Sequence, residues 1–204
     1  RQNAEFIRTA QPEQWDEMTG IAAGAELPME DILLINVPTY FLKNCLGQEC
    51  SMVLARGNAT ADGCTYLAKN RDMGIQIQQV MVEYHYADGT SIAEVGGAGI
   101  VTYPALGVNS MGLTVTSTGF WSPKVEVHME DAASRNIFVN MHHLLRTCAT
   151  TQDVLTCLDS YPRMNGLNLI AADESSAVLV ETTRDDYLVE WADERGILYR
   201  TNHY

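Results

Sequence analysis

Three short polar groups in this sequence contain the residue types of a nucleophilic catalytic site. They are Cys50 before an apolar run, the triplet Asn70-Arg71-Asp72 and the triplet Thr201-Asn202-His203. A thiol attacks an amide carbonyl only as a thiolate, which requires a base, and the oxyanion that forms requires hydrogen-bond donors. These groups therefore predict acyl transfer through a cysteine, provided that the fold brings them together.

The base for Cys50 could be the residue's own backbone nitrogen. If Cys50 became the first residue of a chain, its α-amino group, with an ordinary pKa of about 8, could accept the thiol proton. Asp72 would then orient the amino group, and Asn202 would donate to the oxyanion. The residues expected to support this arrangement are Lys69, Asn70 and Arg71.

A hairpin is the element that can bring these groups together. The apolar runs 51–55 and 65–68 are joined by a segment that contains Asp62-Gly63, a strong turn signal. The second strand of a hairpin returns beside the start of the first, so Asp72 is expected near Cys50. Further strands are expected at 80–86, 91–95, 113–117, 167–171, 177–181, 187–191 and 198–201.

Helices are expected before the hairpin and in the middle of the chain. Apolar side chains at helical spacing predict one helix over 11–25 and a second that begins at Pro28 and continues to residue 35. Two more helices are predicted between residues 132 and 160. Strands, then helices, then strands are typical of a layered α+β domain, and no segment has the composition of a linker that would divide it.

Charge and hydropathy exclude two classes of partner. The 204 residues carry a formal net charge of −13. Nucleic-acid binding depends on clustered Lys and Arg, so no nucleic-acid partner is expected. The longest apolar run, 32–37, is far shorter than the ~20 residues of a membrane span. Residue 1 is Arg rather than Met, so loss of an upstream segment is compatible with the sequence, and the compartment stays open between cytoplasm and export.

The cysteines predict neither a disulfide framework nor a metal site. They form an odd set at positions 45, 50, 64, 148 and 157, with no CxxC pair and no histidine at zinc spacing. No metal and no other cofactor is therefore expected. Cys148 and Cys157 are interpreted as small buried apolar residues on helices. The pair His142-His143 also falls on a predicted helix and lacks the i, i+4 spacing of a metal site, so packing or a solvated face is the favoured interpretation.

Longer motifs around these groups resemble one protein family. From residue 49 the sequence resembles the start of mature acyl-CoA:6-aminopenicillanate acyltransferase-like proteins, which form peptidase family C45 within the N-terminal-nucleophile hydrolase superfamily. The resemblance covers nearly the whole chain, and its first two blocks correspond to the family's propeptide. The matching blocks are, in chain order, 20–25, 29–36, 49–53, 57–63, 70–72, 107–113, 162–168 and 201–203.

This resemblance implies a fold and a division of the chain. The fold would be an αββα N-terminal-nucleophile sandwich, and its C-terminal part would be missing from this chain, because family members continue well beyond the 201–203 block. Self-cleavage between Glu49 and Cys50, by an N-to-S acyl shift, would release residues 1–49 as a mainly helical propeptide or α-chain. Residues 50–204 would be the N-terminal and central part of the catalytic β-chain.

The resemblance also implies roles and partners. Cys50 would be the nucleophile that forms a thioester, Asp72 the orienting carboxylate and Asn202 an oxyanion donor. The substrate would be a small-molecule acyl amide or an acyl-CoA-like compound. The processed protein would be an α/β heterodimer, and a homo-oligomer is open. Phe120 and Trp121, which follow a predicted strand, are expected to line the acyl pocket.

Two positions depart from the related choloylglycine hydrolases. This chain has Lys69 where that branch has Arg, and a Lys ammonium cannot reproduce the bidentate fork of Arg. It reads Thr116-Ser117-Thr118-Gly119 where that branch places an Asn. A second oxyanion donor would then have to come from the backbone.

Three alternatives stay open. Cys64, in a Gly-Cys-Thr sequence, is a competing nucleophile, but it stands only eight residues before Asp72, which is too close for a strand, a turn and a return strand. The chain could instead be a non-catalytic or unprocessed relative that binds a ligand or a partner. A papain-like protease is the third interpretation, although Cys50 lacks the flanking signature of that class and a convincing histidine.

Overall fold

The structure is a computed structural model that describes residues 2–36, 49–72, 78–102, 104–119, 137–160, 166–183 and 186–202. Its helices are α1 (Gln2–Ala10), α2 (Pro12–Ala25), α3 (Met29–Asn36), α5 (Ile137–Thr147) and α6 (Thr151–Ser160). The first six strands are β1 (Glu49–Gly57), β2 (Gly63–Asp72), β3 (Gln79–His85), β4 (Ser91–Gly97), β5 (Leu106–Asn109) and β6 (Thr114–Gly119). The remaining strands are β7 (Leu167–Ala172), β8 (Ala177–Thr182), β9 (Tyr187–Trp191) and β10 (Ile197–Arg200).

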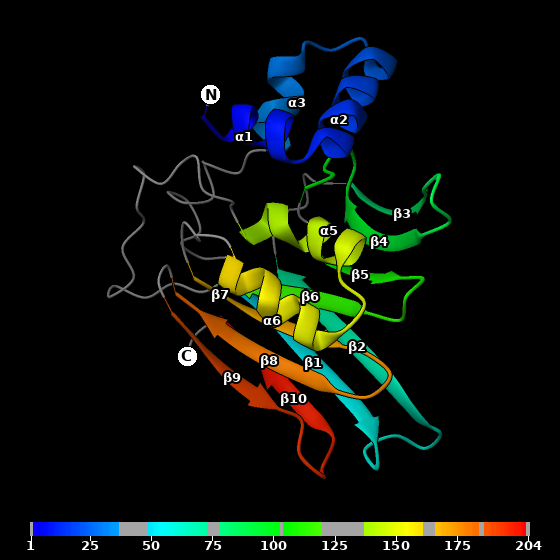
Figure 1. Ribbon diagram of the computed structural model, residues 1–204, viewed down its shortest axis with the longest axis vertical. Helices are drawn as coiled ribbons and strands as arrows, with labels where there is room; N and C mark the ends of the chain where they lie inside the picture. Colours follow the sequence, from blue (N-terminus) through cyan, green and yellow to red (C-terminus); the bar gives the residue numbers. More distant parts are fainter. Residues whose placement is uncertain are drawn as a thin grey trace.

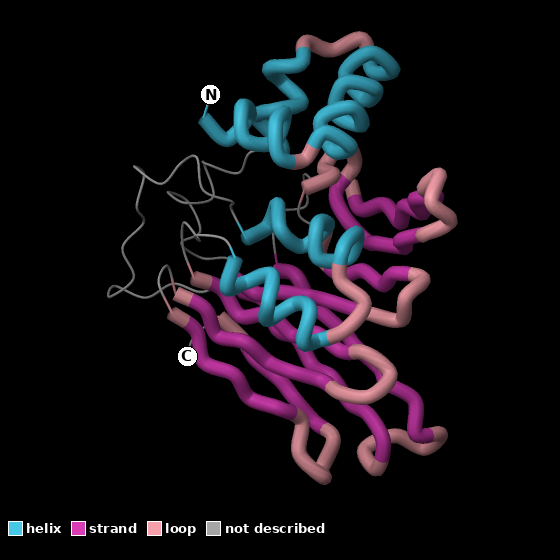
Figure 2. The backbone as a smooth tube through the Cα atoms, in the orientation of Figure 1, coloured by secondary structure: helices cyan, strands magenta, loops and turns pink. Residues whose placement is uncertain are grey.

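Two antiparallel sheets lie face to face. The small sheet has the order β10-β1-β2, and the large sheet runs β3-β4-β5-β6-β7-β8-β9. Helices α5 and α6 cover the large sheet on the face away from the small one, and α1 to α3 form a separate group at one end of the molecule (Figures 1 and 2). The expected mixed α+β class is confirmed. The described residues form a helix layer and two sheets, and they do not include the second helical layer of an αββα sandwich.

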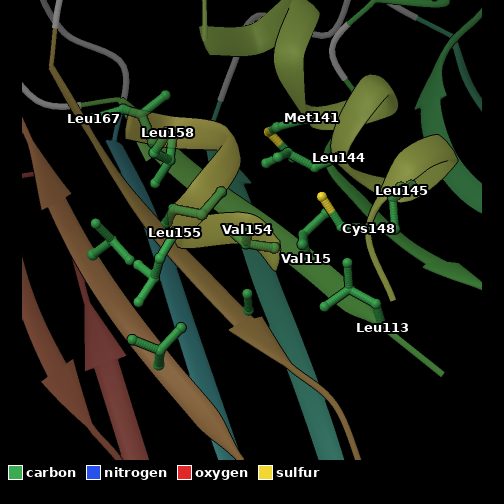
Figure 3. Packing of buried hydrophobic residues seen from close by; sticks show 14 of the residues in the cluster. Leu113, Val115, Met141, Leu144, Leu145, Cys148, Val154, Leu155, Leu158 and Leu167 are labelled. Atoms are coloured by element: carbon green, nitrogen blue, oxygen red, sulfur yellow. The ribbon is translucent and has the colours of Figure 1, made fainter. Parts of the chain in front are cut away.

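Strands β7 and β8 carry the core on both of their faces. On β7, Leu167, Leu169 and Ala171 face the helices, whereas Ile170 and Ala172 face the small sheet. A strand that is buried on both sides is mainly apolar in sequence, and the apolar residues of 167–171 predicted this strand. Figure 3 shows the helix-side cluster, to which the other labelled residues belong: Leu113, Val115, Met141, Leu144, Leu145, Cys148, Val154, Leu155 and Leu158.

The small sheet is buried on one face only. Met52 and Leu54 of β1 point toward the large sheet and are almost fully buried. The opposite face carries Val53, Tyr66, Ile197 and Tyr199, which the register aligns on neighbouring strands and which are 43% to 66% exposed. This outer face of the small sheet is therefore an apolar surface that the described residues leave uncovered.

The N-terminal helices pack against the loop that follows β4. Asn36, fully buried at the end of α3, accepts a hydrogen bond from the Val101 N–H (2.8 Å) and donates to the Gly99 carbonyl (2.7 Å). Val101 also joins Ile7, Met18, Ala22 and Ile32 in a small buried cluster. The helices α2 and α3 confirm the two helices expected from the apolar spacing, whereas α1 and the short strand β5 were not expected.

A second contact joins α2 to α5 through charged and aromatic side chains. Arg146 of α5 pairs with Glu13 of α2 (2.9 Å) and with Asp88 (2.8 Å), and its guanidinium lies 4.0 Å from the centre of the Tyr86 ring. Arg146 therefore ties the N-terminal helices to the sheet and to its helix layer.

Beside Arg146 lies a buried polar network. His142 Nδ1 is 2.9 Å from Glu94 of β4, and His142 Nε2 is 3.0 Å from the Tyr86 hydroxyl. The Tyr84 ring meets the imidazole edge to face, and the Tyr84 hydroxyl bonds to both Glu94 and Glu17 of α2. Burial raises the pKa of Glu17, although the nearby His142 opposes that shift. His142 is thus packed in the interior, which is the first of the two arrangements that the sequence left open, packing or a solvated face.

Candidate active site

The hairpin of β1 and β2 assigns each predicted site residue that it carries to one of the two faces of the small sheet. Asp62 and Gly63 form its turn: Gly63 has φ +76°, which favours glycine, and the Asp62 carboxylate accepts the Cys64 N–H at 3.0 Å. The resulting register pairs Cys50 with Arg71 and Met52 with Lys69. Because directly paired residues point to the same face, Cys50, Lys69 and Arg71 all face the large sheet.

Asn202 holds the backbone of Cys50. The Cys50 N–H donates to Asn202 Oδ1, and Asn202 Nδ2 donates to the carbonyl of Gly119 at the end of β6. Since an N–H can only donate and a carbonyl can only accept, these two partners fix the orientation of the side-chain amide. Cys50 in the small sheet is thereby tied to β6 in the large sheet.

The segment that carries Asn202 is itself fixed by two polar side chains of the large sheet. The Thr201 carbonyl accepts a hydrogen bond from Thr118 Oγ1 (2.8 Å) and another from Asn168 Nδ2 (3.0 Å). Thr118 and Asn168 are paired across β6 and β7 and are fully buried. The layer between the sheets, apolar around Met52, becomes polar where it meets Cys50.

Two cations give the Cys50 thiol an electropositive setting. Lys69 Nζ donates to the carbonyl of Ser117, which encloses the ammonium between the sheets. Burial lowers the pKa of Lys69 to about 8; the charge of Cys50 opposes this shift, and the charge of Arg71 adds to it. Positive charge beside a thiol favours the thiolate. The arrangement is thus suited to nucleophilic attack by Cys50.

Asp72 and Asn70 lie elsewhere on the hairpin. Asp72 pairs with Glu49, the first residue of β1, and Asn70 pairs with Ser51, so both side chains belong to the outer face and are exposed. The structure therefore brings Cys50 together with Lys69, Arg71 and Asn202, and it puts Asp72 next to the bond between Glu49 and Cys50. The predicted pocket residues, Phe120 and Trp121, lie outside the described residues.

Asn168 and Thr118 are the site residues that the sequence interpretation missed. Asn168 Oδ1 is buried without a hydrogen-bond partner among the described residues, a condition that typically costs about 1–3 kcal/mol. A signal for Asn168 was present, because an Asn interrupts the otherwise apolar run 167–172. Thr118 gave no comparable signal, since Thr is common in strands.

The other described cysteines have different surroundings. Cys64 is exposed at the turn end of the hairpin, far along the strands from Cys50, and the charge of Asp62 raises the pKa of its thiol. Cys148 is buried in the core, where a hydrogen bond with Cys157 and burial raise its pKa. Cys64 therefore lacks the positive neighbours that favour a thiolate. Cys148 is buried, as expected, and Cys157 is half-buried.

Two further features bear on ligands. A groove of about 500 Å³ opens between the sheets beside β2, and its lining is mainly apolar: Leu67, Met81, Val95, Leu106 and Val108. Within the described ranges, no group of three His, Cys, Asp or Glu side chains is arranged to hold a metal ion.

None of the described helices combines the length and apolar character that crossing a membrane requires.

Comparison with known proteins gives this fold and site a family. Residues 59–204 match the family model described as acyl-coenzyme A:6-aminopenicillanic acid acyl-transferase. The match spans well over half of the sequence, and the chain belongs to this family, as its motifs predicted. The matched range includes Lys69, Asp72 and Asn202 and begins after Cys50.

Solved structures give a weaker likeness. Penicillin V acylase from Agrobacterium tumefaciens is 14% identical, with a TM-score of 0.42 over 74% of this chain and 43% of its own. A variant of conjugated bile acid hydrolase from Clostridium perfringens is also 14% identical, with a TM-score of 0.39 over 76% of this chain and 45% of its own. The chain thus spans less than half the length of these structures. A search of curated proteins finds no significant match.

Proposed function

We propose that this chain belongs to a self-processing cysteine amidohydrolase or acyltransferase of the N-terminal-nucleophile type, with Cys50 as its nucleophile. The observation that carries the proposal is the bond from the Cys50 N–H to Asn202, a contact across 152 residues that holds the backbone of one particular cysteine. A structural cysteine needs no such anchor. A residue whose nitrogen becomes a catalytic group does.

Cleavage of the Glu49–Cys50 bond would change what that nitrogen can do. In the uncut chain it is an amide and has no basic lone pair. After cleavage it is an α-amino group with an ordinary pKa of about 8, still within reach of Asn202 Oδ1, and it can take the thiol proton. Asp72, which pairs with Glu49 in register, would then orient the new amino group from the outer side of the strand.

The oxyanion would be stabilised by Asn202 and by backbone groups. Asn202 Nδ2 carries two N–H groups, and one of them already donates to the Gly119 carbonyl. The second is the donor that we assign to the oxyanion. Arg71 lies opposite Cys50 and would stabilise the thiolate by its charge.

The reaction would begin with attack of the Cys50 thiolate on an acyl amide or an acyl-CoA-like thioester. The acyl group would form a thioester with Cys50, and water or an amine would then accept it. The family's description names an acyl-coenzyme A compound and an aminopenicillanic acid, which supports an acyl donor and an amine acceptor of this kind. We place Phe120 and Trp121 in the acyl pocket on sequence grounds alone.

The proposal extends to the division of the chain and to its layers. Residues 1–49 would be the α-chain and residues 50–204 part of the β-chain, so that the cut falls at the first bond inside β1. The apolar outer face of the small sheet would be covered by the second helical layer of an αββα sandwich. The exposure of Val53, Tyr66 and Tyr199 supports such a cover.

Self-cleavage can be tested by the intact mass and N-terminal sequence of the purified protein. We expect wild type to contain a fragment that begins Cys50-Ser51-Met52, and Cys50→Ala to stay uncut because the attacking sulfur is gone. Cys64→Ala is the matched control, since it removes a thiol from the same hairpin outside the site, and it should be cut like wild type.

The opposite results would be equally informative. Cleavage that persists in Cys50→Ala and is lost in Cys64→Ala would move the nucleophile to Cys64. A wild-type protein that stays uncut would favour a non-catalytic or unprocessed binding protein.

A further inference from the structure

The uncut chain has no α-amino base for its first reaction. This inference rests on the proposed self-cleavage, in which the Cys50 thiol must lose a proton while the Cys50 nitrogen is still an amide. That nitrogen donates its only proton to Asn202 Oδ1 and offers no lone pair in return. Another group must therefore accept the thiol proton in the precursor.

Lys69 is placed to be that group. It pairs with Met52, two residues along β1 from Cys50, so Lys69 and Cys50 are diagonal neighbours on the face that meets the large sheet. Lys69 Nζ donates to the Ser117 carbonyl, and the Asn202 amide that holds Cys50 donates to the Gly119 carbonyl. These two anchors are two residues apart on β6, roughly 7 Å along a strand. Both side chains are therefore held at one place between the sheets.

The surroundings of Lys69 also favour its neutral form. Burial lowers the pKa of Lys69 to about 8. Lys69 is therefore a neutral amine in roughly a fifth of the molecules at about pH 7.4, whereas an ordinary lysine is neutral in roughly a thousandth. The Ser117 carbonyl accepts an N–H from either form and leaves the amine lone pair available. The hydrogen bond to Ser117 thus holds the Lys69 side chain in place in both its charged and its neutral form.

Few other groups can compete for the proton. Among the described residues, the charged neighbours of Lys69 are Cys50 and Arg71. The elements that pack against it from the other sheet and from the end of β10 contribute neutral groups around the site: Ser117, Thr118, Asn168 and Asn202. Arg71 cannot lose its proton in a protein, so Lys69 is the group here that can act as a base.

We propose that Lys69 is the proton acceptor for Cys50 during self-cleavage. The neutral Nζ takes the proton from Cys50 Sγ, and the thiolate attacks the carbonyl carbon of Glu49, so that an S–C bond forms and the carbonyl oxygen becomes an oxyanion. The C–N bond to Cys50 then breaks, and the Lys69 ammonium returns the proton to the departing nitrogen. Water hydrolyses the thioester, which leaves a Glu49 carboxylate and restores the thiol.

The test separates the charge of Lys69 from its ability to accept a proton. Lys69→Arg keeps a cation that cannot act as a base, and Lys69→Met keeps an unbranched chain without charge. Full-length precursor is made by a short cell-free synthesis pulse and shifted to buffers from about pH 6 to pH 9, and cleavage is followed on gels. We expect the wild-type rate to rise with a midpoint near pH 8, and both variants to be slower by about 100-fold or more.

A second readout guards against misfolded variants. Alkylation of Cys50 by iodoacetamide, followed by mass spectrometry, reports the thiolate directly. Lys69→Arg should still be alkylated readily, because its positive charge remains, whereas alkylation at a fixed pH should be slower in Lys69→Met. Arg195→Met, which removes an exposed cation from a distant turn, is the matched control and should behave as wild type in both measurements.

The possible outcomes distinguish this inference from the proposed function. If Lys69→Arg is cut at the wild-type rate with the wild-type midpoint, Lys69 is not the proton acceptor and self-cleavage stands. If wild type is never cut, self-cleavage fails. The inference then fails with it, and an unchanged alkylation rate in Lys69→Met would overturn the coupling of Lys69 to Cys50 as well.

Discussion

Asp173 joins two elements through one carboxylate. Its Oδ2 accepts the N–H of Thr151 at the start of α6 (2.7 Å), and its Oδ1 accepts the N–H groups of Ser175 and Ser176 in the β7–β8 turn (both 2.8 Å). Burial alone would raise the pKa of Asp173, but these hydrogen bonds outweigh burial and hold the pKa well below its usual range. The ionised form is therefore the one that stabilises the fold.

Replacing this carboxylate should cost stability in a pH-dependent way. Asp173→Ala removes several charge-assisted hydrogen bonds, and we expect a loss of about 2–4 kcal/mol in the free energy of unfolding by urea at neutral pH. A depressed carboxyl pKa stabilises the fold above the unfolded value of about 3.9, and the contribution is lost as the pH falls toward the folded value. The difference from wild type should therefore shrink below about pH 4.

The control for Asp173 is Asp193→Ala. Asp193 lies in an exposed turn and bonds to Arg195, so its removal should destabilise the fold much less than removal of Asp173. An Asp173→Ala variant as stable as the Asp193→Ala variant would show that the capping bonds contribute little.

At the scale of elements, a close approach joins the end of β1 to the start of β10. Gly196 precedes β10 with φ +68°, and its carbonyl accepts the Arg56 N–H at 2.9 Å. A Cβ on Gly196 would lie 2.1 Å from the Arg56 carbonyl oxygen, which belongs to rigid backbone. The pairing that carries Thr201 and Asn202 toward Cys50 thus begins at a position where only glycine fits.

Gly196→Ala should therefore destabilise the protein more than an ordinary turn substitution. We expect a loss of at least about 2 kcal/mol in thermal or urea unfolding, because the strain of a positive φ adds to the clash with Arg56. Gly89→Ala is the matched control: Gly89 also has a positive φ, +87°, but nothing lies within 4 Å of its Cβ position, and we expect about 1 kcal/mol. Equal losses in both variants would argue against the close approach.

Sequence patterns predicted the elements whose formation depends on neighbouring residues, and they missed one that depends on a tertiary contact. The β1–β2 hairpin follows from Asp62-Gly63, and the strand at 167–171 follows from its apolar run. Strand β5 was not predicted because it is only four residues long and contains Gly107, a poor strand former. A Cβ on Gly107 would lie 2.4 Å from the Leu145 side chain, so the reason for this glycine is a tertiary contact with α5.

The same distinction applies to the candidate site. Cys50 and Asn202 could be selected because the residue types and flanking motifs mark them. The anchoring carbonyls of Ser117 and Gly119 could not, because a backbone carbonyl leaves no trace in residue type. The separation of Asp72 from the inner face follows from the register, in which Arg71 rather than Asp72 pairs with Cys50, and a hairpin prediction does not resolve a one-residue difference.

At the scale of the whole molecule, Glu17 makes attachment of the N-terminal helices sensitive to pH. Burial raises the pKa of Glu17, so the attached state binds a proton more tightly than the detached state does. Its contribution is most favourable at low pH and is lost as the pH rises through the raised pKa. Neutral pH therefore weakens this contact.

Glu17→Gln should remove that dependence. We expect the variant to melt at a higher temperature than wild type at about pH 7 and to match it more closely near pH 4.5, because glutamine stays neutral and can still accept the Tyr84 bond. Differential scanning fluorimetry across this range measures the effect. Glu30→Gln, an exposed substitution on α3, should leave the profile unchanged. A pH profile of Glu17→Gln parallel to that of wild type would contradict the role of Glu17.

The hydrogen bond between Cys50 and Asn202 can form only late in the synthesis of the chain. The two residues are 152 positions apart, and a ribosome adds about 5–20 residues per second, so the cysteine is synthesised roughly 8–30 s before the amide that holds its backbone. Until the end of the chain is made, Thr118 of β6 and Asn168 of β7 lack the Thr201 carbonyl to which they donate. The order of synthesis therefore imposes a delay. The Cys50 thiol acquires its complete surroundings only after the described helices and strands have been made.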